Sequence, residues 1–160
     1  MMRVLIMAFF VFMGMVGTVS AQEFYKEGAF TVRKVEGACK LEIALPLDKE
    51  KDTAAILAIF PKDEYYGELF TERKRIGLAQ KKVDIIFDKE KPRSINFVPK
   101  TDGNDDYWRW QYLESTKGML DEVKRRNNMV VKFSNGKKSF EFTVSLKGST
   151  KAVTTLLQCK

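Results

Sequence analysis

The two cysteines, Cys39 and Cys159, are the residues of this chain whose chemistry is easiest to foresee. Two thiols in one chain form a single disulfide when the protein works in an oxidising compartment. The alternatives are two unpaired buried thiols or one reactive cysteine. A reactive thiolate is usually activated by histidine, and the sequence contains none. We therefore expect a disulfide between Cys39 and Cys159.

Carboxylates are the side chains of this sequence that could still support catalysis. The absence of histidine excludes Ser–His–Asp and Cys–His catalysis and histidine-based metal sites. The sequence has no glycine-rich phosphate loop and no nucleotide fingerprint, so we expect no cofactor. A two-carboxylate hydrolase stays formally open. However, neighbouring acids such as Asp63-Glu64 and Asp121-Glu122 fall in an expected loop and on an exposed helix face. Plain surface charge is the favoured interpretation, and we expect no catalytic residue.

One acidic loop is similar in sequence to the first part of a calcium-binding loop. Asp102, Asn104 and Asp106 stand at alternate positions, as the first ligands of such a loop do. The pattern then fails, because Tyr107 stands where glycine is needed and Leu113 where a bidentate glutamate is needed. A solvated turn is favoured, and we expect no metal.

An aromatic run after this loop is the best candidate for a binding surface. As a strand it places Trp108, Trp110 and Tyr112 on one face, with Tyr107, Arg109 and Gln111 on the other. In one alternative the Trp face belongs to the core and the Tyr-Arg-Gln row is exposed. In the other, the Trp face is open and binds a glycan or a partner chain. Since Tyr, Trp and Arg are enriched at binding hot spots, the candidate binding residues are Tyr107, Trp108, Arg109, Trp110 and Tyr112, together with the loop that begins at Asp102.

The elements that must position these residues are mostly strands. Alternating apolar residues predict strands over 30–34, 38–45, 54–60, 69–71, 76–79, 83–87, 94–98, 107–113, 129–133 and 139–146. Segment 54–60 also fits a short helix, and 69–71 and 76–79 are expected as edge strands. Asn135-Gly136 is a strong hairpin signal. Helices are expected from 115 or 116 to 127 and over 150–159, the second capped by Ser149 after a turn at Gly148. We expect a single β-sandwich-like domain, mainly β with two short helices and closed by the C-terminal helix.

The same periodicity places both cysteines on apolar faces. Cys39 alternates with Leu41 and Ile43 along the strand 38–45. Cys159 follows Leu156 on the apolar face of the closing helix. A bridge between them would fasten the last helix to an early strand.

The C-terminal third resembles a known family. Ser145-Leu146-Lys147-Gly148-Ser149 follows an alternating hairpin and leads into the helix that ends at Cys159. This arrangement is similar to the end of small exported bacterial proteins of the invasion-associated locus B type, and of related uncharacterised periplasmic proteins of alphaproteobacteria. The resemblance implies a β-sandwich-like domain with no catalytic residues. It also implies an envelope or secreted protein that acts by contact, with host cells among its targets.

The first 21 residues predict export. One charge at Arg3 precedes an apolar run over 4–16, and Val19-Ser20-Ala21 then offers small residues before Gln22. The alternative is a membrane anchor, but the run is shorter than the ~20 residues that span a bilayer. We expect a signal peptide over 1–21 and a single exported domain over 22–160. The protein would leave by the Sec pathway for the periplasm or the medium, with no stable membrane span after cleavage.

The net charge of +7 restricts the possible classes of partner only slightly. Such a surplus favours anionic partners or simply keeps the protein soluble. The basic residues are spread along the chain with acids among them and accompany no nucleic-acid motif, so we expect no nucleic-acid partner.

Three functions fit the sequence. The leading one is a non-enzymatic envelope or secreted binding protein with an unknown protein, glycan or other envelope partner. The alternatives are an inhibitor of a foreign or host hydrolase, which inhibition assays would detect, and a carboxylate-based cell-wall or glycan hydrolase. The hydrolase needs a deep cleft that holds a carboxyl group of raised pKa.

We predict that the exported protein begins at Gln22, because Val19 and Ala21 occupy the −3 and −1 positions of a cleavage site. An intact-mass measurement on protein recovered from the periplasm or the medium checks this. Retention of residues 1–21 would contradict it.

Overall fold

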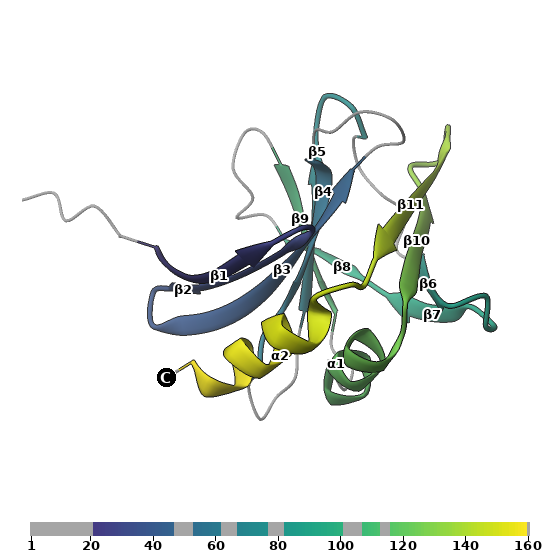
Figure 1. Ribbon diagram of the computed structural model, residues 1–160. Helices are drawn as coiled ribbons and strands as arrows, with labels where there is room; N and C mark the ends of the chain where they lie inside the picture. Colours follow the sequence, from purple (N-terminus) through teal and green to yellow (C-terminus); the bar gives the residue numbers. More distant parts are fainter. Residues whose placement is uncertain are drawn as a thin grey trace, which may run out of the picture.

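Two antiparallel β-sheets face each other, and two helices close one end of the space between them (Figure 1). The computed structural model describes residues 21–46, 53–61, 67–76, 82–100, 107–112 and 116–159. Within these residues the larger sheet has seven strands in the order β1-β2-β3-β4-β5-β9-β8, and the smaller has four in the order β11-β10-β6-β7. The strands are β1 (Gln22–Glu27), β2 (Phe30–Val35), β3 (Ala38–Pro46), β4 (Thr53–Ile59), β5 (Gly67–Glu72), β6 (Lys82–Phe87), β7 (Arg93–Asn96), β8 (Val98–Lys100), β9 (Tyr107–Tyr112), β10 (Asn128–Ser134) and β11 (Ser139–Ser145).

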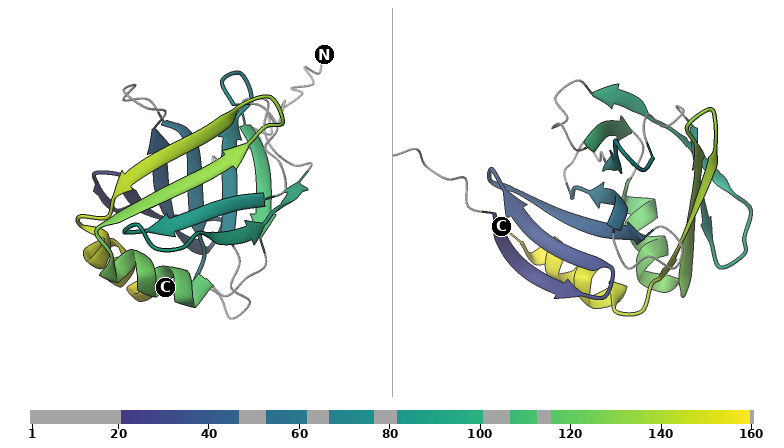
Figure 2. Two further views of the ribbon diagram at one scale, coloured as in Figure 1. Left: turned by 90° about the vertical axis from the view of Figure 1, so that its right-hand side faces the viewer. Right: turned by 90° about the horizontal axis from the view of Figure 1, so that it is seen from above.

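Side chains that alternate along the strands build the core. In β11, Phe142 and Val144 are buried, whereas the neighbouring Glu141 and Thr143 are exposed. Strands β3, β6 and β10 also alternate, and the inward faces of the two sheets pack together (Figure 2). The predicted mainly β sandwich is therefore confirmed.

The two helices cover the open end of this core. Helix α1 (Thr116–Arg125) buries Met119, Leu120 and Val123, and its last turn carries basic residues that suit the helix dipole. Helix α2 (Ser149–Gln158) contacts β1, β2, β3 and α1. The C-terminal helix thus closes the domain, as the sequence predicts.

The disulfide between Cys39 and Cys159 is confirmed. It joins β3 to the residue directly after α2, with the two Cα atoms 6.1 Å apart and a sequence separation of 120. One detail differs from expectation. Cys159 has extended backbone angles and lies one residue beyond the helix rather than on its last turn.

Several strands differ from the prediction, because polar or irregular residues obscured their pattern. Strand β1 was not expected, since only Tyr25 of its six residues is buried. Strand β5 was expected at an edge but lies between β4 and β9, where its polar Glu68 and Thr71 are both buried. Segment 54–60, by contrast, is the strand β4, as predicted, and not the alternative helix. Of the expected strand 76–79, Ile76 lies in a turn, and the rest falls outside the described residues.

The expected strand 94–98 serves both sheets. Its first part is β7 in the smaller sheet, and its end begins β8 in the larger one, with the buried Phe97 as the only residue between them. The alternating pattern does not show the change of sheet. Ile95 and Phe97 are buried, whereas Val98, the first residue of β8, is 57% exposed although it continues the apolar run.

Ser149 does not cap α2 as predicted. The cap position belongs to Gly148, whose φ of 89° lies in the left-handed region that glycine adopts without strain. The Ser149 hydroxyl instead donates a hydrogen bond to the Val123 carbonyl oxygen at 2.7 Å. It therefore links the end of α1 to the start of α2.

Replacing Cys159 with alanine should lower the free energy of unfolding by roughly 2–4 kcal/mol, because the unfolded chain regains the freedom of a long closed loop. Urea unfolding of the non-reduced protein measures this. The double variant Cys39→Ala/Cys159→Ala should match the single variant. A wild-type midpoint in both would show that the bond contributes nothing.

Candidate binding site

Strand β9 carries the aromatic candidates and lies between β5 and β8, one position from an edge of the larger sheet. Its register places Trp108 opposite Thr71 and Trp110 opposite Leu69, and both of these β5 residues are fully buried. The choice between core and binding surface for the two Trp residues stays a prediction. The reason is that the side chains of four of the aromatic candidates lie outside the described part of the chain: Tyr107, Trp108, Trp110 and Tyr112.

Arg109 is placed by a buried carboxylate. Its guanidinium donates to Glu68 Oε1 through Nε at 2.8 Å and also through Nη2. The Glu68 side chain is only 3% exposed, whereas that of Arg109 is 28% exposed. A buried carboxylate is costly without a cation beside it, so this pairing holds the Arg109 side chain of β9 against Glu68 of β5. The expected exposed row is therefore half-buried at Arg109 and at Gln111.

The same face of the larger sheet carries further paired charges. Glu42 accepts contacts from Arg33 Nε at 3.0 Å and Lys40 Nζ at 2.7 Å. Lys40 Nζ also lies 5.8 Å from the ring centroid of Phe70, which pairs with Arg109 across the strands. These side chains form ion pairs and a cation–π contact with one another. This face of the sheet therefore presents paired charges of both signs and not a surface potential of one sign.

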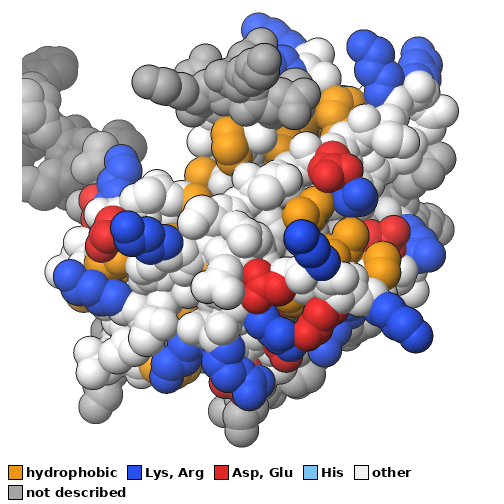
Figure 3. Space-filling view, turned by 45° about the vertical axis from the view of Figure 1, so that its right-hand side comes forward, with side chains coloured by type: hydrophobic (Ala, Val, Ile, Leu, Met, Phe, Trp, Pro, Cys, Tyr) orange, Lys and Arg blue, Asp and Glu red, His pale blue; other side chains and the backbone are white. Residues whose placement is uncertain are grey.

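Charges of both signs are also mixed elsewhere on the surface. Figure 3 shows Lys and Arg side chains beside Asp and Glu over one face, with small groups of hydrophobic side chains between them. The positive surplus is thus distributed, which suits solubility better than the steering of a polyanion.

A hollow of about 400 Å³ lies between the β1–β2 turn and the end of β11. Sequence reasoning missed it, because its lining comes from separate segments and contains no motif. The lining residues are Glu27, Gly28, Ala29, Pro46, Thr143, Val144, Ser145 and Lys147.

Tyr25 holds one wall of the hollow in place. Its hydroxyl donates to Glu27 Oε2 at 2.8 Å and lies 3.3 Å from the Gly148 carbonyl oxygen. Burial, and then the Glu27 carboxylate, raise the pKa of Tyr25, so the hydroxyl stays a donor at neutral pH. Lys151 Nζ lies 5.5 Å from the ring centroid of Tyr25. Tyr25 therefore holds the Glu27 carboxylate beside the turn before α2.

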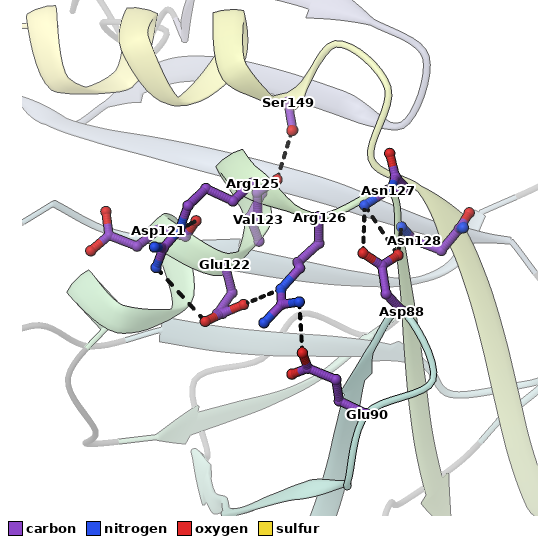
Figure 4. Close-up of polar contacts among 10 residues, drawn as sticks. All are labelled: Asp88, Glu90, Asp121, Glu122, Val123, Arg125, Arg126, Asn127, Asn128 and Ser149. Carbon is purple, nitrogen blue, oxygen red and sulfur yellow. Dashed lines mark hydrogen bonds and ion pairs between the residues drawn. The ribbon is translucent and has the colours of Figure 1, made fainter.

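A second polar cluster ends α1 (Figure 4). Asp88, in the turn after β6, accepts hydrogen bonds from the backbone N–H groups of Asn127 and Asn128, the shortest at 2.8 Å. These groups direct the chain from α1 into β10. The cluster is therefore a structural joint between a helix and a sheet.

Arg126 completes this joint. It contacts Glu122 at 2.6 Å and Glu90 at 2.6 Å, which connects α1 to the β6–β7 turn. The hydrogen bond from Arg126 lowers the pKa of Glu122, against the opposing effect of burial. The same bond raises the pKa of Arg126.

The described residues contain no group of three or more His, Cys, Asp or Glu that can hold a metal ion. No described helix is long and apolar enough to cross a membrane. The calcium-like residues Asp102, Asn104 and Asp106 lie outside the described part.

Comparison with known proteins gives one informative match. No protein-family model and no curated protein matches the sequence. The structure matches the crystal structure of invasion associated protein B from Bartonella henselae, with a TM-score of 0.59 and 13% sequence identity. The match covers 84% of this chain and 95% of that one. The two proteins share a fold. The resemblance seen in the C-terminal third is thus confirmed as a structural likeness over most of the chain.

The invasion associated protein B fold and the disulfide are consistent with an exported protein. Disulfides form and persist in oxidising compartments. Both observations agree with the export that the first 21 residues predict. Those residues lie almost wholly outside the described part.

Glu122 should stabilise the fold only while it is ionised. Its lowered pKa means that this stability is present above the ordinary pKa of about 4 and is lost as the pH falls through the folded-state pKa. The difference in free energy of unfolding between wild type and Glu122→Gln should favour wild type at pH 7 and shrink below about pH 4.

Urea unfolding at several pH values measures this difference. Glu141→Gln is the matched control, because the Glu141–Lys132 pair is largely exposed and such pairs contribute little. A wild-type advantage over Glu122→Gln that is the same at pH 3 and pH 7 would sink the prediction.

Proposed function

We propose that this chain is a non-enzymatic binding protein that leaves the cytoplasm by the Sec pathway. It would work in the bacterial periplasm or outside the cell, by contact with a protein or a glycan, host surfaces included. The observation that carries the proposal is the disulfide-closed β fold, which matches invasion associated protein B over 84% of the chain.

The disulfide supports the location. It lies between β3 and the end of α2, so the pairing depends on the complete fold rather than on a local motif. A reducing cytoplasm would leave both thiols free and remove this closure. Placing the protein outside the cytoplasm therefore agrees with its covalent structure.

The geometry favours binding over hydrolysis. A glycoside hydrolase needs two carboxyl groups about 5–9.5 Å apart across a cleft. Among the described residues that line the hollow, Glu27 is the one carboxylate, and it already accepts a hydrogen bond from Tyr25. Glu42 and Glu68 lie on the sheet face and are held by cations. These acids serve structure, which supports a function by contact.

The proposed contact surface is the candidate segment 102–112. Arg109 keeps about a quarter of its side chain exposed while it holds Glu68. A cation fixed in this way loses little side-chain entropy when a partner binds, which is a property of binding hot spots. This pre-organisation supports the choice of β9 over the exposed lysines elsewhere.

Capture by the immobilised mature protein, with its disulfide intact, tests the proposal. The sources are solubilised envelopes, culture medium, host-cell membranes and a glycan array. A specific partner should be retained by wild type, and Tyr107→Ala and Trp110→Ala should reduce its retention by about tenfold or more, as hot-spot truncations do.

Arg109 needs its own controls, because Arg109→Ala leaves the buried Glu68 unpaired and destabilises the fold. The double variant Glu68→Gln/Arg109→Ala removes both charges, so weak capture by both variants indicates loss of a contact rather than loss of folding. Arg125→Ala, an exposed change at the end of α1, should capture like wild type. Equal capture by every variant would place the contact elsewhere, and hydrolysis of a captured glycan would contradict the proposal.

A further inference from the structure

Strand β11 forms an open edge of the smaller sheet. It is the outermost strand there, and among the described residues it pairs only with β10 (Figure 2). The pairing is regular from Asn128↔Ser145 to Ser134↔Ser139. The other side of β11 therefore presents a straight strand edge of seven residues.

Two hydrogen bonds at the ends of the hairpin show which main-chain groups point outward. Asn135 N donates to the Lys138 carbonyl at 3.0 Å, and Leu146 N donates to the Asn127 carbonyl at 2.7 Å. Bonded and non-bonded pairs alternate along an antiparallel ladder. Residues 140, 142 and 144 therefore bond to β10. The main-chain N–H and C=O groups that point away from β10 are those of Ser139, Glu141, Thr143 and Ser145.

The other three sheet edges carry the features that protect an edge from pairing. Strand β1 has an irregular register between Glu23 and Tyr25 and is rich in charges. Strand β7 has only four residues, and β8 has three that include Pro99. Strand β11 has neither proline nor a register shift. Its single charged side chain, Glu141, is paired with Lys132 on β10 at 2.8 Å. It is the unprotected edge of the described fold.

The hollow lies directly beside this edge. One wall is formed by residues 143–145 of β11, and the opposite wall by the β1–β2 turn and Pro46. The wall groups are mostly small or apolar, and Glu27 and Lys147 supply one charge of each sign. The space next to the outward main-chain groups is thus bounded on both sides, as a slot for one added strand must be.

We propose that the edge of β11 binds an extended segment of a partner polypeptide, which adds as a fifth strand to the smaller sheet and passes through the hollow. The outward N–H and C=O groups repeat at strand spacing, and another extended backbone matches that repeat. A glycan or a lipid headgroup lacks alternating donors and acceptors at this spacing. The site is separate from the segment 102–112 and does not depend on it.

The bounded slot also selects the form of the partner. A second copy of this chain would bring its whole β10–β11 hairpin to the edge, whereas the slot beside residues 143–145 has the β1–β2 turn as its far wall. A single extended segment is the occupant that such a slot admits. Specificity would then come from side chains directed at Ala29, Pro46 and the Glu27–Lys147 pair.

An array of random-sequence heptapeptides is the probe for this site. Wild type should bind a subset of the peptides. In solution the best binder should slow hydrogen exchange at the amides of Glu141 and Thr143, which pair with no strand among the described residues before it is added. Thr143→Pro removes one outward N–H and no bond to β10, because an edge strand accepts proline at such a position. It should weaken binding by about tenfold, and Thr143→Val, which keeps the N–H, should bind like wild type.

Modified peptides keep the test independent of how the variant folds. N-methylation of the bound peptide at the residues that face β11 should abolish binding, and methylation at the intervening residues should leave it unchanged. Binding that is equally sensitive at both sets of positions overturns the proposal, as does binding without protection of Glu141 and Thr143. Absence of binding to every peptide of the array also overturns it. A wild-type dimer that Thr143→Pro converts to a monomer overturns it as well, because that result assigns the edge to a second copy of the chain.

Discussion

The packing of α2 against β1, β2 and β3 is the constraint on which the rest of the structure depends. The buried faces of the two sheets would otherwise meet water at this end, because α2 and α1 together form the cover. Ala152, Val153 and Leu156 supply the apolar contact. The bond from Cys39 to Cys159 prevents the helix from leaving. Ser149 joins the two helices, and Tyr25 contacts the turn between β11 and α2. Of the two candidate surfaces, the β11 edge leads directly into this closure, because α2 follows β11 through the turn at Gly148.

The fold could be predicted wherever local pattern and tertiary environment agree. Strand β11 alternates without interruption and follows Asn135-Gly136, so its existence, direction and inward face were all predictable. Strand β5 was misplaced, because the burial of Glu68 depends on Arg109, which is 41 residues away in sequence. The split at Phe97 was also missed, since Ile95, Phe97 and Val98 together have the pattern of one strand although Val98 is exposed in the structure.

The candidate sites could likewise be predicted only in part. The disulfide was predictable, because two cysteines on apolar faces in an oxidising compartment leave few other pairings. The hollow was not, since Glu27, Pro46 and Thr143 meet only through the packing of one sheet on the other. The outward groups of β11 are main-chain atoms, which every sequence contains. Only the order of the described strands shows that no other described strand pairs with them.

The single residue between β7 and β8 has a mechanical consequence. Those two strands are the edges by which the sheets are joined, and the chain between them is Phe97 alone, buried and therefore unable to extend into solvent. The β11 edge lies on the opposite side of the smaller sheet, where α2 and the Cys39–Cys159 bond tie the chain back to the larger sheet. The smaller sheet is therefore fastened to the larger one at both margins, by one buried residue at the first and by a helix with a covalent bond at the second. This double attachment restricts rotation of one sheet against the other.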